Sequence, residues 1–192
     1  GVQTCALPIS IGFRDGFETI PSNYPMSEKF YVILNDNKAE KEETIFSQFS
    51  AWTHEERTKI NHITKNLDFI KTLKPKRKNL YNLPTGDIPT VDYYKEMIRH
   101  RFVLAPRGGA VDTHRFYEAL KARSIPIVKS TNTAFDIIYK SFPCIVLNDW
   151  NELLNFKCGR TELLNMVEKI DELHEKTNSL RINADNLTSV FI

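Results

Sequence analysis

The sequence predicts an α/β fold, in which a doubly wound parallel sheet carries helices on both faces. Two short apolar runs, 102–105 and 125–129, are typical of buried parallel strands because they lack alternating polar residues. Helical patterns separate the predicted strands along the chain, and strands that alternate with helices form parallel sheets. Ligands of such sheets bind at the carboxyl ends of the strands, so we expect a functional site there.

Composition indicates a single globular domain, or one lobe of a larger enzyme. The chain has 192 residues, of which 41% are hydrophobic and 26% are charged, and these values exclude a disordered or fibrous protein. A formal net charge of +2 lacks the basic excess of nucleic-acid-binding proteins, so no nucleic-acid partner is expected. Any anion site must therefore be local.

The sequence pattern indicates neither a membrane-spanning segment nor a cysteine-based metal site or disulfide framework. No apolar run approaches the roughly 18 to 20 residues of a membrane span. The three cysteines, Cys5, Cys144 and Cys158, have no metal-ligand spacing and are too few for a disulfide framework. We expect Cys144 to be a small core residue and Cys158 to lie in a loop.

Four segments are predicted along the chain. Residues 1–9 look like translated sequencing adapter, so the reading frame is expected to begin inside a longer gene, and the location of the parent protein stays open. Residues 10–28 carry glycines and prolines typical of an interdomain linker. The domain itself is predicted over 29–180, followed by a tail or helix over 181–192.

Local patterns predict the elements of this domain. The expected strands cover 30–34, 44–50, 79–83, 102–105, 125–129 and 144–147. Helices are expected from an N-cap at Thr53 to about residue 70, over 91–100 and 113–123, after Asp149-Trp150, and over 161–180. The basic run at 71–78 is interpreted as a solvated loop.

The segment 106–120 carries the strongest functional signal, because a strand end, a glycine-bearing loop and a helix start follow one another. Gly108 and Gly109 allow backbone amides to approach a ligand, and the helix start presents unpaired N–H groups suited to phosphate. Arg107, His114 and Arg115 add cationic donors. Cations are unfavourable at a helix N-terminus, so three of them there favour a bound anion.

Helical spacing also places Glu118 on the stripe of His114 and Arg115, where a carboxylate can accept hydrogen bonds from ribose or sugar hydroxyls. A purely structural interpretation is equally compatible with the spacing. In it, Asp112 is the N-cap, Arg115 and Glu118 form an ion pair, and His114 is a surface residue. The glycine pair matches neither the dinucleotide-binding pattern nor a P-loop.

The order of residues favours the functional interpretation. Phe-Val-Leu-Ala-Pro-Arg-Gly is followed by Asp-x-His-Arg-x-Tyr-Glu-Ala-Leu, then Ile-Pro-Ile-Val-Lys-Ser, and later Pro-Cys-Ile-Val-Leu-Asn-Asp-Trp. This string, over Tyr93 to Asn151, resembles the carboxyl-terminal half of exostosin-like glycosyltransferases. Weaker similarity reaches upstream to 46–50, Thr53 and Arg57. The resemblance implies a Rossmann-like donor-binding lobe of a two-lobed (GT-B) glycosyltransferase.

The resemblance also implies a ligand and residue roles. Arg115 would meet the diphosphate of a UDP- or GDP-linked sugar, and Glu118 its ribose or sugar. Arg107, Gly108 and Gly109 would form the loop beside the phosphates, while Asp112 and His114 match in type only. The remaining donor-binding positions are the two that end the third part of the string, Lys129 and Ser130.

The same resemblance bears on the reaction and its partners. No Asp-x-Asp motif is present, so no metal cofactor is expected. The glycan or other hydroxyl acceptor, with the catalytic base, is expected on an N-terminal acceptor lobe outside this sequence, and this chain alone is expected to be inactive.

One position of this chain departs from the pattern of the exostosin-like family. Where the family has a glycine after the helix, this chain has Arg123-Ser124, so Arg123 either adopts a left-handed conformation or the turn differs.

Two alternative functions are also compatible with the sequence. They are a nucleotide- or phosphate-binding α/β domain without transferase chemistry, and a scaffold or response-regulator-like domain. The response-regulator version is disfavoured because no cluster of strand-end aspartates is present.

Overall fold

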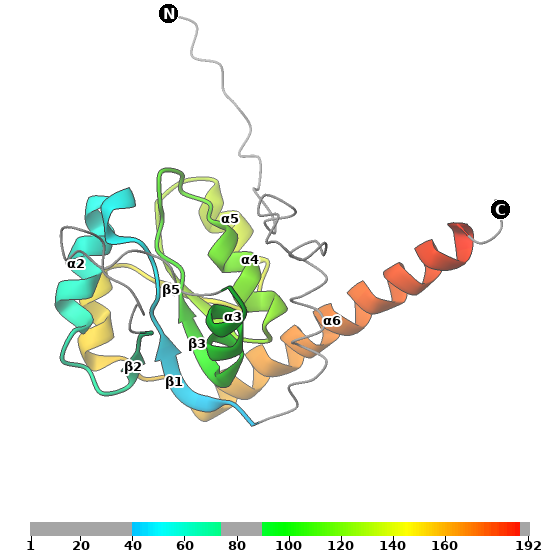
Figure 1. The fold of residues 1–192 in the computed structure, drawn as a ribbon, viewed down its shortest axis with the longest axis horizontal. Coiled ribbons are helices and arrows are strands. Elements are labelled where there is room, and N and C mark those ends of the chain that lie inside the picture. The colour runs from blue at the N-terminus through cyan, green and yellow to red at the C-terminus, as the bar shows by residue number, and fades with distance from the viewer. Residues whose placement is uncertain (1–39, 74–89, 189–192) are drawn as a thin grey trace, which may run out of the picture.

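The computed structural model describes residues 40–73 and 90–188, and it confirms the α/β class. Five strands form one all-parallel sheet in the order β2-β1-β3-β4-β5 (Figure 1). They are β1 (Glu42–Phe46), β2 (Ile70–Lys71), β3 (His100–Leu104), β4 (Ile125–Lys129) and β5 (Ile145–Leu147). The direction of winding reverses between β1 and β3, which is where doubly wound sheets place their ligands.

Helices follow the strands in the manner of a Rossmann-like fold. The α-helices are α2 (Glu55–Thr64), α3 (Thr90–Arg99), α4 (His114–Lys121), α5 (Phe135–Lys140) and α6 (Arg160–Thr188). Two short 3₁₀ helices, η1 (Ala51–Thr53) and η2 (Trp150–Asn155), precede α2 and follow β5. None of the helices in the described part of the chain is long and apolar enough to cross a membrane.

Two buried clusters hold the helices to the sheet. Ile45 and Phe102 pack in the larger cluster with Ile60 of α2 and Leu153 of η2. Their strand neighbours Phe46 and Val103 point the other way, because successive strand side chains alternate between faces. They pack in a second cluster with Met97 of α3 and Ala119 of α4. Figure 1 shows α2 on one side of the strands and α3 and α4 on the other.

The first predicted helix is shorter than its pattern indicated, and Thr53 is not its N-cap. His54 takes that position, because its Nδ1 accepts a hydrogen bond from the amide of Glu56 at 3.2 Å. The helix ends at Thr64, and Ile70 joins the sheet beside Ile45. The apolar spacing that suggested a continuous helix arises from two elements that both contact the core.

Other boundaries also differ from the prediction. The helix expected over 113–123 is α4, which ends at Lys121, and Arg123 adopts the left-handed conformation with φ 54°. The strand expected over 44–50 ends at Phe46. α5 was not predicted from the sequence pattern, and the segment after Asp149 is a 3₁₀ helix. α6 continues to Thr188, past the predicted end at 180.

The cysteines in the described part of the chain lie as expected. Cys144 is partly buried against the larger cluster, and burial raises the pKa of its thiol to about 12. Cys158 lies in the loop before α6. The predictions for 1–9 and 10–28, the strands at 30–34 and 79–83, and most of the basic run fall outside the described residues.

Candidate functional site

The loop after β3 carries the glycine pair, and its two members have different surroundings. Gly108 is buried, and its amide donates to the carbonyl of Ala110 at 3.0 Å, which closes a tight turn. A Cβ atom on Gly108 would lie 3.0 Å from Nη2 of Arg57, whereas one on Gly109 would meet nothing within 4 Å. Gly108 is therefore needed for packing against Arg57, while Gly109 borders open space.

Arg57 of α2 holds this loop in place through hydrogen bonds to backbone carbonyls. Its Nε donates to the carbonyl of Arg107 at 2.8 Å, its Nη2 to that of Pro106 at 3.1 Å, and its Nη1 to that of Ser50 at 3.4 Å. The side chain thus joins the segments that follow β1 and β3, at the reversal point of the sheet. Burial, followed by the nearby charge of Arg115, lowers the pKa of Arg57 to about 10, so it stays charged at neutral pH.

Arg115 and Glu118 are joined through a tyrosine. The Nε of Arg115 donates to the hydroxyl of Tyr93 at 3.2 Å, and that hydroxyl lies 3.3 Å from Oε2 of Glu118. Tyr94 donates to the other oxygen of Glu118 at 3.2 Å. The guanidinium carbon of Arg115 lies 5.8 Å from the ring centre of Phe49 and 5.9 Å from that of Tyr93. Both groups predicted to bind the donor therefore belong to one aromatic-lined network.

The remaining residues at the start of α4 do not form the expected cap. α4 begins at His114, so Thr113 takes the N-cap position and Asp112 precedes it. Asp112 is buried and accepts a hydrogen bond from the hydroxyl of Tyr117 at 3.2 Å. The structural interpretation of Asp112 as N-cap is therefore wrong, because its side chain turns toward α4's Tyr117. His114 is half-buried.

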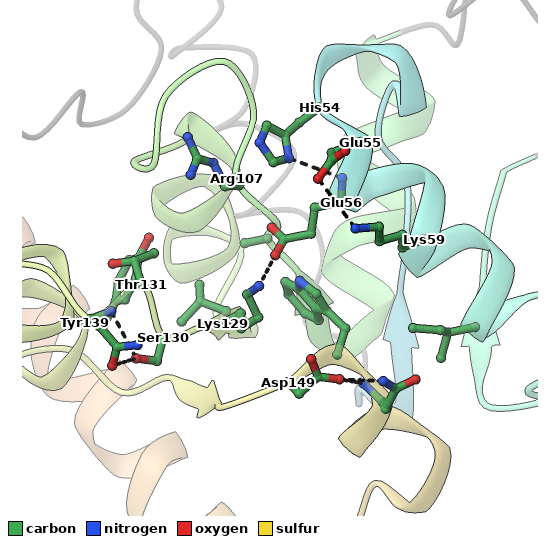
Figure 2. A pocket seen from close by; sticks show the side chains of 16 residues that line it. His54, Glu55, Glu56, Lys59, Arg107, Lys129, Ser130, Thr131, Tyr139 and Asp149 are labelled. Carbon is green, nitrogen blue, oxygen red and sulfur yellow. Dashed lines mark hydrogen bonds and ion pairs between the residues drawn. The ribbon is translucent and has the colours of Figure 1, made fainter.

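A cavity of about 480 Å³ opens at the carboxyl edge of the sheet (Figure 2). It lies between the amino end of α2 and the ends of β3, β4 and β5, which is the predicted position of a ligand site. Its volume is in the range of small-molecule sites. Its polar walls are formed mainly by His54, Glu55, Glu56, Lys59, Arg107, Lys129, Ser130, Thr131, Asn132, Asp149, Trp150 and Asn151.

The cavity is lined by cationic side chains and by two residues with buried donors. Lys129 of β4 forms an ion pair with Glu56 of α2, and Figure 2 shows the two side chains meeting in the cavity. The Nε of Arg107 and the indole Nε1 of Trp150 are buried and have no hydrogen-bond partner among the described residues. Trp150 is 4% exposed. A buried donor without an acceptor is costly, and a ligand oxygen would satisfy it.

Ser130 is held by the loop that follows it. Its hydroxyl donates to Asp136 at 2.6 Å, and the amides of Thr131 and Asn132 donate to the same carboxylate at 2.9 Å and 3.0 Å. Desolvation opposes the charge of Asp136, but these hydrogen bonds outweigh it and lower its pKa overall. The Asp136 carboxylate thus already occupies the amides that a phosphate would otherwise use at the start of α5.

The structure brings together only part of the predicted site. Arg107, Lys129 and Ser130 line the cavity, whereas Gly108, Gly109, Asp112, His114, Arg115 and Glu118 do not. Sequence reasoning missed His54, Glu56 and Trp150. The position of Trp150 just after a predicted strand was the one available signal. Nothing local indicated that Glu56 would face Lys129.

Fold and cavity define the chain as a Rossmann-like α/β domain with a polar cavity at the carboxyl edge of its sheet. Among residues 40–73 and 90–188, no group of three or more His, Cys, Asp or Glu side chains is placed to hold a metal ion. Comparison with models of known protein families and with curated proteins gave no match.

Proposed function

We propose that this domain is the donor-binding lobe of a glycosyltransferase, and that it binds a nucleotide-diphosphate sugar at the carboxyl edge of its sheet. The observation that carries the proposal is the cavity, which is lined by Arg107, Lys129 and Trp150, and the indole N–H of Trp150 has no hydrogen-bond partner among the described residues. The resemblance of residues 93–151 to exostosin-like glycosyltransferases supports the same class of ligand.

The cavity suits the anionic part of such a donor. A guanidinium binds phosphate oxygens through two parallel hydrogen bonds, and an ammonium adds a compact charge. Arg107 follows β3 and Lys129 ends β4, so both project from neighbouring strands toward one space. The half-buried Arg115 lies near Arg57, which holds the backbone of Arg107, and would extend the positive surface along the loop.

In the proposed reaction, the cationic residues of the cavity stabilise the leaving group. Glycosyl transfer passes through an oxocarbenium-like state, while the nucleotide diphosphate departs with negative charge. Cations that are already in place stabilise this charge more strongly as it develops. In this proposal the base that activates the acceptor hydroxyl comes from a second lobe.

Thermal unfolding with uridine or guanosine diphosphate tests the proposal. A ligand present at about 100 times its Kd stabilises the folded state by about 2.7 kcal/mol, which corresponds to several degrees in Tm. We expect one of the two nucleotides to produce such a shift, and Arg107→Ala and Lys129→Ala each to remove most of it. Arg160→Ala is the matched control, since Arg160 is exposed at the start of α6 and does not line the cavity.

The outcomes separate the hypotheses. A shift that survives both cavity substitutions would place the ligand elsewhere and refute the site. No shift with either nucleotide would favour a scaffold domain. Arg107→Ala should leave the Tm of the ligand-free protein nearly unchanged, because the Arg107 contact with Arg57 uses its backbone carbonyl.

A second candidate is a nucleotide-binding domain without transferase chemistry. Glu118 favours it, because both of its oxygens are engaged by tyrosines, whereas the family resemblance assigns this residue to the donor. Competition between uridine diphosphate and uridine-diphosphate sugars distinguishes the two. A donor lobe should bind at least one sugar conjugate more tightly than the bare nucleotide, whereas the non-catalytic domain should show no such gain.

A further inference from the structure

The two cations of the cavity differ in how they are partnered. Lys129 is neutralised by Glu56, whose side chain is 10% exposed, while that of Lys129 is 30% exposed. The Nε of Arg107 has no partner among the described residues. An incoming anion therefore finds one available guanidinium and one ammonium already held by a carboxylate.

Glu56 is held in this position by its own helix. It lies in the first turn of α2, where the positive end of the helix dipole favours an acidic residue. The hydrogen bond from its amide to His54 fixes the start of the helix. Glu56 consequently keeps a favourable electrostatic environment when Lys129 is taken away, and displacement does not leave a buried charge without any partner.

From this geometry we propose that Glu56 is an internal competitor for the ligand, and that an anionic group binds Lys129 only by displacing the Glu56 carboxylate. The inference rests on the proposed function. Every ligand that uses Lys129 bears the same cost, so binding requires further contacts, which Arg107 and the Trp150 indole N–H supply. Glu56 thus lowers the affinity for every such anion, and anions with few oxygen atoms, which make few of these further contacts, bind weakly.

Calorimetric titration of the Glu56→Gln variant tests the competition, with uridine diphosphate and inorganic pyrophosphate as the probes. Glutamine keeps the size of the side chain but removes the charge that holds Lys129. We expect both probes to bind about fivefold more tightly than to the unsubstituted protein, since an ion pair that must be broken offsets affinity by about that factor. Glu56→Asp, which keeps the charge but shortens the reach, should give a smaller gain.

Glu55→Gln is the matched control. Glu55 also lines the cavity, but its carboxylate pairs with Lys59 at 3.5 Å, and both side chains are largely exposed. The substitution removes one negative charge from the same wall without releasing Lys129. Its effect on affinity should stay within about twofold.

The outcomes distinguish this inference from the proposed function. If the unsubstituted protein binds a probe and Glu56→Gln binds it equally or more weakly, Glu56 is not a competitor, while the proposed function stands. If Glu55→Gln gains as much as Glu56→Gln, general electrostatics replaces the competition. If neither the protein nor any variant binds either probe, the proposed function and the inference fall together. Melting of each variant without ligand checks that it is folded.

Discussion

The cavity and the network around Arg115 share the loop after β3, and they differ in how completely their polar groups are satisfied. In the network, Arg57 donates to three carbonyls, and both oxygens of Glu118 accept hydrogen bonds. In the cavity, donors of Arg107 and Trp150 have no partner among the described residues. Hydrogen bonds that are formed stabilise a conformation, whereas a buried donor without a partner costs free energy until an acceptor reaches it.

This difference changes the roles implied by the sequence. Arg115 and Glu118 carried the donor-site hypothesis, yet Glu118 is 7% exposed and engaged. We therefore expect substitutions in the network to act mainly on stability, and substitutions in the cavity to act mainly on ligand binding. In the network we expect the largest loss of stability at Arg57, smaller losses at Glu118 and Gly108, and the smallest effect at Tyr93.

Arg57→Ala should destabilise the domain most, by about 3 kcal/mol, because it leaves three loop carbonyls without their donor and removes a buried side chain. Urea unfolding measures this loss. Lys59→Ala is the control on the same helix, since the Lys59 side chain is 68% exposed, and it should change stability by less than about 0.5 kcal/mol. Equal losses for the two variants would contradict a fixing role for Arg57.

Glu118→Ala should cost about 2 kcal/mol, because it removes the acceptor of two tyrosine hydroxyls, those of the buried Tyr94 and the partly buried Tyr93. Glu118→Gln keeps one acceptor oxygen and should cost less. The measurement is the free energy of unfolding in the absence of ligand. If Glu118→Ala is as stable as the unsubstituted protein but no longer binds nucleotide, Glu118 belongs to the binding site, and the contrast between the two regions is wrong.

Gly108→Ala should cost about 1 kcal/mol, since the new methyl group would lie 3.0 Å from Arg57 Nη2 and the guanidinium must shift. Gly109→Ala is a matched control from the same loop, because its methyl group would meet nothing within 4 Å. The Tm difference between the two variants isolates the packing against Arg57. A larger loss of stability for Gly109→Ala would mean that the loop requires glycines for their backbone freedom and not for packing against Arg57.

The sequence predicted those elements whose signal is local. The strands β3 and β4 and the helix between them follow from apolar runs and from a helical pattern within 30 residues. β2 has two residues and exists through its pairing with β1, so the helical spacing of its apolar residue was misleading. α5 has six residues and begins in a polar segment, which gave no periodic signal.

The site was harder to predict than the fold, for a geometric reason. The cavity wall combines residues near 54–59, 105–107, 128–132 and 149–151, and only the fold brings these segments together. Arg107 was found because it is a cation in the glycine-bearing loop after a predicted strand, and Lys129 because it ends one part of the string that carries the family resemblance. Glu56 was missed because an acidic residue in a first helical turn is ordinary in sequence, and its partner Lys129 is far along the chain.

The smallest expected effect on stability in the network is that of Tyr93, and it is expected only at high pH. Burial raises the pKa of its hydroxyl above its ordinary value of about 10, with Glu118 adding to the rise against the opposing charge of Arg115. Above pH 10 the unfolded chain therefore releases this proton before the folded protein does. The contribution of Tyr93 to stability is complete below pH 10 and falls as the pH rises further.

Tyr93→Phe removes this proton, so its stability should decline less steeply between pH 9.5 and 11. The comparison is between unfolding free energies of the two proteins over that interval, and it isolates one tyrosine because Tyr139, whose pKa burial also raises, is present in both. Parallel pH profiles would show that the Tyr93 hydroxyl ionises alike in the folded and unfolded chains. Such a hydroxyl would be open to solvent, and the network would then be as available to a ligand as the cavity.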